Sequence, residues 1–122
     1  MTQKILIVDD EPHMRRITEL SLRKGGFEIT IGRNGREAVE LAGQEQPALI
    51  VMDLQMPEMD GLTALKHLKS GQATAHIPVI MLTVRGQAIS REQAESSGAA
   101  LYLTKPFSPS HLLAEVQRLL AS

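Results

Sequence analysis

Three runs of consecutive apolar residues constrain the fold of this chain more than any other feature of its sequence. They lie at residues 5–8, 48–52 and 78–82. A strand that is covered on one face alternates apolar and polar residues, whereas a strand buried on both faces, as in parallel sheets, does not alternate. The runs therefore predict a parallel sheet that is covered by helices on both faces.

Two further segments complete the predicted sheet. Residues 27–31 alternate with period two, which is typical of a strand near a sheet edge, and residues 101–104 predict a fifth strand. Stripes of apolar residues at helical spacing separate the strands, and each begins at a proline or a capping side chain. These helix starts are Pro12, Asn34, Asp60 and Pro109.

The segment between residues 90 and 97 predicts one more helix. Ser90 and Gln93 have the spacing of a capping box, but only Ile89 and Ala94 are clear apolar contacts. A helix with so few apolar anchors is expected to be mobile.

The alternation of five strands with five helices predicts an α/β fold, a doubly wound parallel sheet with right-handed crossovers. A chain of 122 residues with 43% hydrophobic content can form one core but not two ordinary domains, so we expect a single domain over residues 1–122. In such sheets ligands bind beyond the carboxyl ends of the strands. We therefore expect the chemistry in the loops that follow the strands.

Composition narrows the classes of function. Thirteen Lys and Arg against fourteen Asp and Glu leave a net charge of −1, which gives no overall attraction to nucleic acid or to a membrane surface. The absence of cysteine excludes disulfides, thiolate metal sites and cysteine nucleophiles, and suits a cytoplasmic location. The first apolar run is short and ends in three acids, which predicts neither a signal peptide nor a membrane span.

Polar residues gather directly after four of the predicted strands. They are Asp9, Asp10 and Glu11 after the first, Asp53 after the third, Thr83 after the fourth and Lys105 after the fifth. Each alone has an ordinary explanation, such as a helix cap or a turn. Together they lie at one edge of the sheet, where two or three carboxylates can hold Mg2+ and leave positions for water and phosphate. Without a cation, such crowded carboxylates repel one another and raise the pKa of at least one.

Given a metal ion, Asp53 can act as a nucleophile that forms an aspartyl phosphate. The ion, the Lys105 ammonium and the Thr83 hydroxyl can then compensate the charge on the phosphoryl oxygens. The set of residues therefore predicts phosphoryl transfer to Asp53.

The chain resembles the receiver domains of two-component response regulators, and single-domain chemotaxis regulators in particular, from Ile5 to Leu120. The matching segments are VDDEP at 8–12, MDLQMPEMDG at 52–61, LT at 82–83 and YLTKPF at 102–107. The resemblance implies a flavodoxin-like strand order of 2-1-3-4-5 and a cis peptide bond before Pro106.

The resemblance also implies a role for each site residue. Asp10, Asp53 and the backbone carbonyl of Gln55 would bind Mg2+, and Asp9 would act through water. Asp53 would accept the phosphoryl group from a phosphohistidine of a sensor histidine kinase or phosphotransfer protein. The domain would catalyse only its own phosphorylation and dephosphorylation, so it would not be an enzyme with an external substrate.

A conformational change is implied as well. Thr83 and Lys105 would contact the phosphoryl group, and Tyr102 would turn inward when the Thr83 hydroxyl moves. The surface of the fourth helix, fifth strand and fifth helix would change as a result, and it would be read by an output protein that the sequence does not identify.

Three features depart from the family pattern or vary within it. The family usually has a small residue where this chain has Val84, whose methyl groups would crowd the approach to Asp53. Gln55 and Arg85 flank the expected phosphoryl group and would tune how fast water removes it. Residues 99–101 are apolar where transcription regulators of the family carry acids for a charged dimer face, so a monomer or weak dimer is expected.

Other functions stay open at this point. The chain could be a receiver-like binding module that signals without phosphorylation, which Val84 favours, or a receiver taken from a longer regulator. An aspartate-dependent phosphatase would need an Asp-x-Asp motif, which neither 9–11 nor 53–55 supplies. A flavodoxin would need a hydroxyl-rich first loop and more aromatic residues than the 2% present.

Overall fold

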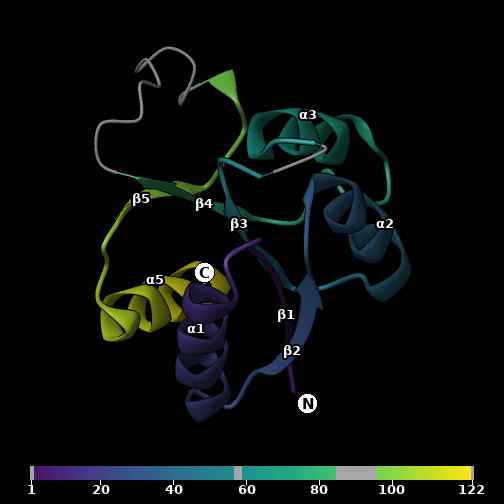
Figure 1. The fold of residues 1–122 in the computed structure, drawn as a ribbon. Coiled ribbons are helices and arrows are strands. Elements are labelled where there is room, and N and C mark those ends of the chain that lie inside the picture. Colours follow the sequence, from purple (N-terminus) through teal and green to yellow (C-terminus); the bar gives the residue numbers. More distant parts are fainter. Residues whose placement is uncertain (1, 57–58, 85–95, 122) are drawn as a thin grey trace.

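The computed structural model describes residues 2–56, 59–84 and 96–121. Within these ranges five parallel strands form one sheet in the order β2-β1-β3-β4-β5 (Figure 1). The strands are β1 (Lys4–Val8), β2 (Glu28–Gly32), β3 (Leu49–Asp53), β4 (Val79–Val84) and β5 (Leu101–Lys105). The predicted flavodoxin-like α/β fold and its strand order are therefore confirmed.

The described part of the chain contains four helices, three between strands and one after β5. They are α1 (Pro12–Lys24), α2 (Gly35–Glu45), α3 (Gly61–Ser70) and α5 (Pro109–Ala121). The predicted caps are present, since the side chains of Asn34 and Asp60 accept hydrogen bonds from the backbone N–H groups of the residues three positions later. The predicted helix near residues 90–97 lies almost entirely outside the described residues. None of the four described helices is long and apolar enough to cross a membrane.

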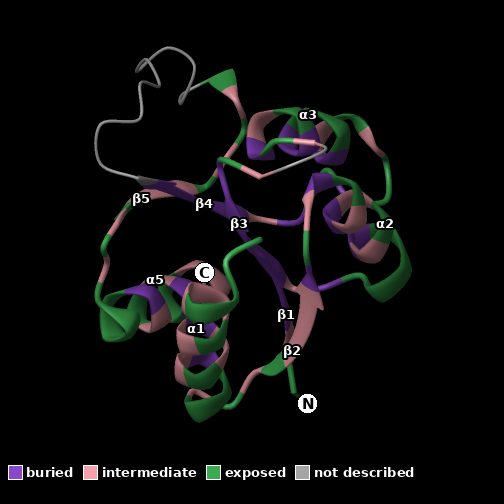
Figure 2. Ribbon diagram, viewed as in Figure 1, coloured by how far each residue is buried: buried purple, intermediate pink, exposed green. Residues whose placement is uncertain are grey.

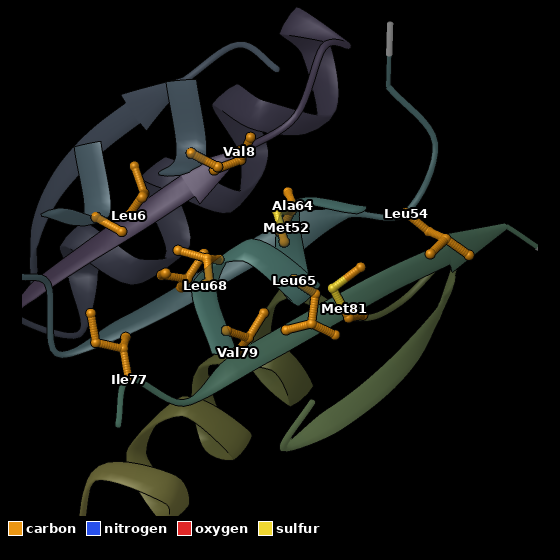
Figure 3. Close-up of a cluster of buried hydrophobic side chains, with 13 residues drawn as sticks. Leu6, Val8, Met52, Leu54, Ala64, Leu65, Leu68, Ile77, Val79 and Met81 are labelled. Carbon is orange, nitrogen blue, oxygen red and sulfur yellow. The ribbon is translucent and has the colours of Figure 1, made fainter. Parts of the chain in front are cut away.

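The helices cover both faces of the sheet. α1 and α5 lie side by side on one face, and α2 and α3 lie on the other (Figure 1). Alternate residues of a central strand point to opposite faces, so Leu6 and Val8 join the core under α2 and α3 while Ile5 and Ile7 join the core under α1 and α5. Figure 3 shows the first of these cores. This two-sided burial explains why the apolar runs do not alternate.

Burial falls from the centre of the sheet to its edge. Residues 5–8 and 49–52 are fully buried, whereas β2 is mostly half-buried (Figure 2). This confirms the edge position predicted for residues 27–31. The two cores pack against the central strands from both faces and fix their positions along the sheet. The carboxyl ends of these strands carry the candidate site.

Candidate metal and phosphoacceptor site

The register of the sheet brings two acids together at the ends of β1 and β3. Val8 is level with Met52 across the β1–β3 pair, and Asp53 is level with Leu82 across the β3–β4 pair. Asp9 follows Val8 directly, so its carboxylate lies beside that of Asp53. The ends of the buried strands therefore hold two acids together that are far apart in the sequence.

One lysine ammonium lies between these two acids. Lys105 Nζ is 3.2 Å from Asp9 Oδ2 and 3.1 Å from Asp53 Oδ2. The exposed fraction of Asp9 is 1% and that of Asp53 is 6%, so both contacts are shielded from water. Two buried negative charges share one positive charge, which leaves the site with an excess of negative charge.

A third acid completes the cluster. Asp9, Asp10 and Asp53 each offer a carboxylate oxygen, and these oxygens lie within 4.8 Å of one another. Asp10 is exposed, so the cluster opens to solvent on its side. Magnesium prefers oxygen ligands and keeps several waters, and the donor atoms and the open side of the cluster fit those preferences.

Backbone groups fix the orientation of the two buried acids. The N–H of Glu11 donates to Asp9 Oδ1 at 2.9 Å, and the N–H of Gln55 donates to Asp53 Oδ1 at 3.3 Å. Arg15 donates from its guanidinium to the backbone carbonyl of Asp9 at 3.0 Å. Each carboxylate thus has one oxygen on a backbone N–H and the other on Lys105.

The surroundings of Asp53 raise its pKa, chiefly through burial. Burial raises this pKa above its ordinary value against the opposing effect of Lys105, and the neighbouring Asp9 carboxylate raises it further. Burial alone would lower the pKa of Lys105, but the attraction of Asp9 and Asp53 outweighs burial and raises it. The ammonium therefore stays charged, and a further cation would relieve the remaining repulsion.

Gly61 determines how closely the chain passes Asp53. A Cβ atom at this position would collide with the backbone carbonyl of Asp53, and it would lie 2.7 Å from Met81 Cε and 2.8 Å from Leu54 Cα. The N–H of Gly61 also donates to the carbonyl of Leu54 at 2.8 Å. Only glycine allows this approach, so Gly61 sets the position of the loop after β3.

Thr83 lies at the same edge of the sheet but is bonded elsewhere. It directly follows Leu82, the residue level with Asp53, and its exposed fraction is 7%. Its hydroxyl donates to the backbone carbonyl of Leu103 in β5 at 3.4 Å, which is long for a hydroxyl donor and therefore weak. A stronger acceptor near Asp53 would compete for this hydroxyl.

Tyr102 is half-buried in β5 and packs against the core under α2 and α3. Its phenolic oxygen is 2.9 Å from Ser97 Oγ. The sequence carries no signal for this contact, because nothing in the spacing of Ser97 and Tyr102 indicates that they meet. The peptide bond between Lys105 and Pro106 is cis, as the resemblance implied.

The remaining predicted site residues are only partly described. Gln55 is exposed next to Asp53. The backbone of Val84 ends β4 level with Lys105, while its side chain and the whole of Arg85 lie outside the described residues.

The model of the response regulator receiver domain family matches residues 5–117 of this chain. The chain therefore belongs to the receiver domain family of two-component response regulators.

Its curated relatives include the transcriptional regulatory protein SrrA of Staphylococcus aureus, which is 42% identical over 120 residues. The match covers 98% of this chain and 48% of SrrA, so the chain spans about half the length of the curated relatives that it matches.

Solved structures of the family superimpose closely on this fold. A putative response regulator from Chloroflexus aurantiacus has a TM-score of 0.92 and 32% identity, with both chains covered completely. The receiver domain of the sensor histidine kinase PA1611 from Pseudomonas aeruginosa has a TM-score of 0.90 and 31% identity, also with complete coverage, and carries a magnesium ion coordinated in its active site cleft. The chemotaxis response regulator CheY4 of Vibrio cholerae has a TM-score of 0.89 and 30% identity, over 98% of this chain and 99% of CheY4.

Proposed function

We propose that this chain is a phosphorylation-activated signalling switch that accepts a phosphoryl group on Asp53. The donor is a phosphohistidine of a sensor histidine kinase or a phosphotransfer protein. The observation that carries the proposal is the shared ammonium, since Lys105 Nζ lies between the buried carboxylates of Asp9 and Asp53. A buried acid with a cation beside it and a second acid nearby is suited to take up a phosphoryl group together with a metal ion.

Magnesium is the cofactor of the proposed reaction. Asp9, Asp10 and Asp53 supply carboxylate oxygens within 4.8 Å of one another, and we assign the backbone carbonyl of Gln55 as a further ligand. The PA1611 receiver domain, which has the same fold, holds magnesium in its active site cleft. When bound, the ion supplies positive charge for the phosphoryl oxygens.

The chemistry that follows is an in-line displacement. A carboxylate oxygen of Asp53 attacks the phosphorus, the bond between phosphorus and the histidine nitrogen breaks, and its electron pair stays on the imidazole, which takes up a proton from solvent. Lys105 already contacts Asp53 Oδ2, so its ammonium is in place to pair with a phosphoryl oxygen. The Thr83 hydroxyl pairs with another after leaving the carbonyl of Leu103.

Water ends the phosphorylated state by attacking the phosphorus of the aspartyl phosphate, which breaks the bond to the Asp53 oxygen, releases inorganic phosphate and restores the carboxylate. We also propose that Gln55 and Arg85 tune how fast water reaches the phosphoryl group, and that Val84 slows phosphorylation by small phosphodonors. The change at Thr83 then passes through β5 to the surface that β5 and α5 form with the helix predicted near residues 90–97. An output protein binds this surface.

Intact-mass spectrometry with a small phosphodonor tests the proposal. The native protein should gain one phosphoryl mass only when Mg2+ is present, and Asp53→Asn should gain none. Asp60→Asn is the matched control, because it makes the same change at an exposed helix cap and asparagine caps as well as aspartate. Equal labelling of the native protein and Asp53→Asn would exclude Asp53 as the acceptor.

A further inference from the structure

A serine hydroxyl holds the Tyr102 ring from outside the phosphoryl site. Ser97 Oγ is 2.9 Å from the Tyr102 hydroxyl and also accepts a hydrogen bond from the N–H of Ala99 at 3.3 Å. Gly98 has a left-handed φ of 88°, a conformation that glycine adopts readily. Ser97 lies four residues before β5 begins at Leu101, and the turn at Gly98 leaves its hydroxyl beside that of Tyr102.

The backbone around this contact is anchored. The N–H of Ala100 donates to the carbonyl of Val79 at 2.8 Å, which ties the segment before β5 to the start of β4. The Tyr102 ring packs against the core under α2 and α3, and residue 102 is level with Met81 in β4. The ring is therefore fixed at both ends, by the core at its base and by Ser97 at its hydroxyl.

The residue next to Tyr102 connects this contact to the phosphoryl site. The Thr83 hydroxyl donates to the carbonyl of Leu103. A phosphoryl group on Asp53 would attract the Thr83 hydroxyl and break its hydrogen bond to Leu103, which lies next to Tyr102 in β5. Any movement of the ring that follows must break the bond between Tyr102 and Ser97.

We propose that Ser97 is a positioning residue for Tyr102. The Ser97 hydroxyl holds the tyrosine ring in the orientation seen in this structure, and so sets how readily the ring moves when Asp53 is phosphorylated. This inference rests on the proposed function of Asp53. A net hydrogen bond of ordinary strength changes an equilibrium between two states by about fivefold. Loss of the Ser97 hydroxyl should therefore favour the moved state of Tyr102 by about that factor.

The composition of the chain provides a specific readout. Tyr102 is its only tyrosine and tryptophan is absent, so intrinsic tyrosine fluorescence reports this one ring. The native protein is titrated with beryllium fluoride, a phosphoryl mimic, at a fixed excess of Mg2+. We expect a fluorescence change whose midpoint falls to about one fifth of the native concentration in Ser97→Ala. Ser97→Thr keeps the hydroxyl and should restore the native midpoint.

Ser70→Ala is the matched control. Ser70 lies in α3 beside the same cavity as Ser97. Within the described part of the chain, its hydroxyl bonds only to the carbonyl of His67 in its own helix. The beryllium fluoride midpoint of Ser70→Ala should stay at the native value. Urea unfolding of every variant shows that each is folded at the start of the titration, and a purely structural role for Ser97 would change the unfolding midpoint without changing the beryllium fluoride midpoint.

The outcomes separate the two proposals. An equal midpoint for the native protein and Ser97→Ala would overturn the role of Ser97 and leave the role of Asp53 intact. Amide NMR shifts near Asp53 without any change in tyrosine fluorescence would remove Tyr102, and Ser97 with it, from the response. No shift near Asp53 at all would contradict the proposed function itself.

Discussion

Replacing Asp53 by asparagine should make the metal-free protein more stable at neutral pH. The substitution keeps the size of the side chain and removes its charge. At an effective dielectric constant of about 20, an Asp9–Asp53 oxygen separation of at most 4.8 Å gives a repulsion of at least about 3.5 kcal/mol, and the Lys105 contact at 3.1 Å gives an attraction of about 5 kcal/mol. Taking a carboxylate out of water costs several kcal/mol in addition.

These opposing effects nearly cancel. The attraction exceeds the repulsion by at most about 1.5 kcal/mol, and the cost of burial exceeds that difference, so the Asp53 charge destabilises the folded state by about 1 to 2 kcal/mol. Lys105 keeps Asp9 as its partner in the variant. We therefore expect Asp53→Asn to raise the free energy of unfolding by about 1 to 2 kcal/mol at pH 7.

The gain should depend on pH in a defined direction. The folded-state pKa of Asp53 is raised from the ordinary value of 3.8, so the folded protein binds this proton more tightly than the unfolded chain. The native protein then loses stability relative to the variant as the pH rises from 3.8 through the folded-state pKa. The difference is complete above the folded-state pKa of Asp53 and disappears below 3.8.

Urea unfolding in a chelator-containing buffer measures both effects by circular dichroism. Asp60→Asn serves again as the control and should show no comparable gain. A lower stability of Asp53→Asn at pH 7 would refute the reasoning, because it would show that the Lys105 attraction outweighs burial and repulsion.

Four further results are expected. Saturating Mg2+ should stabilise the native protein by about 2.7 kcal/mol at one hundred times its dissociation constant, and a melting temperature that does not respond to Mg2+ would count against the metal site. Gly61→Ala should cost about 1 to 3 kcal/mol in urea unfolding because its Cβ meets backbone, whereas Gly43→Ala, in open space within α2, should gain about 1 kcal/mol. Thr18→Val should gain about 1 kcal/mol in the same assay, since the buried Thr18 hydroxyl has no hydrogen-bond partner among the described residues. Val84→Ala should be phosphorylated faster than the native protein by small donors in a stopped-flow assay, and an equal or slower rate would refute the predicted crowding.

The strands and helices could be predicted because their signals are local. The apolar runs gave β1, β3 and β4 within one or two residues, and the caps at Asn34 and Asp60 marked the starts of α2 and α3. The convergence of Asp9, Asp53 and Lys105 followed from the rule that parallel strands share one carboxyl edge. The order of the strands came from the resemblance, since the spacing of the runs does not specify which strands pair.

The contacts that refine the site could not be predicted, because they depend on where side chains meet in space. Neither the collision that requires glycine at residue 61 nor the contact between Ser97 and Tyr102 has a sequence signal. The same holds for Lys69, whose ammonium donates to the carbonyls of Ala75 at 3.0 Å and Ile77 at 2.8 Å. These contacts fix the connection between α3 and β4, and only the folded arrangement shows them.

Locating the acceptor residue tests the central claim most directly. The protein is incubated with Mg2+ and a small phosphodonor, the acyl phosphate is reduced with borohydride, which converts a phosphorylated aspartate to homoserine, and peptides are sequenced by mass spectrometry. Homoserine should appear at residue 53 and at no other aspartate. Homoserine at residue 9 or 10, or a phosphoryl group on a histidine with residue 53 unchanged, would contradict the account.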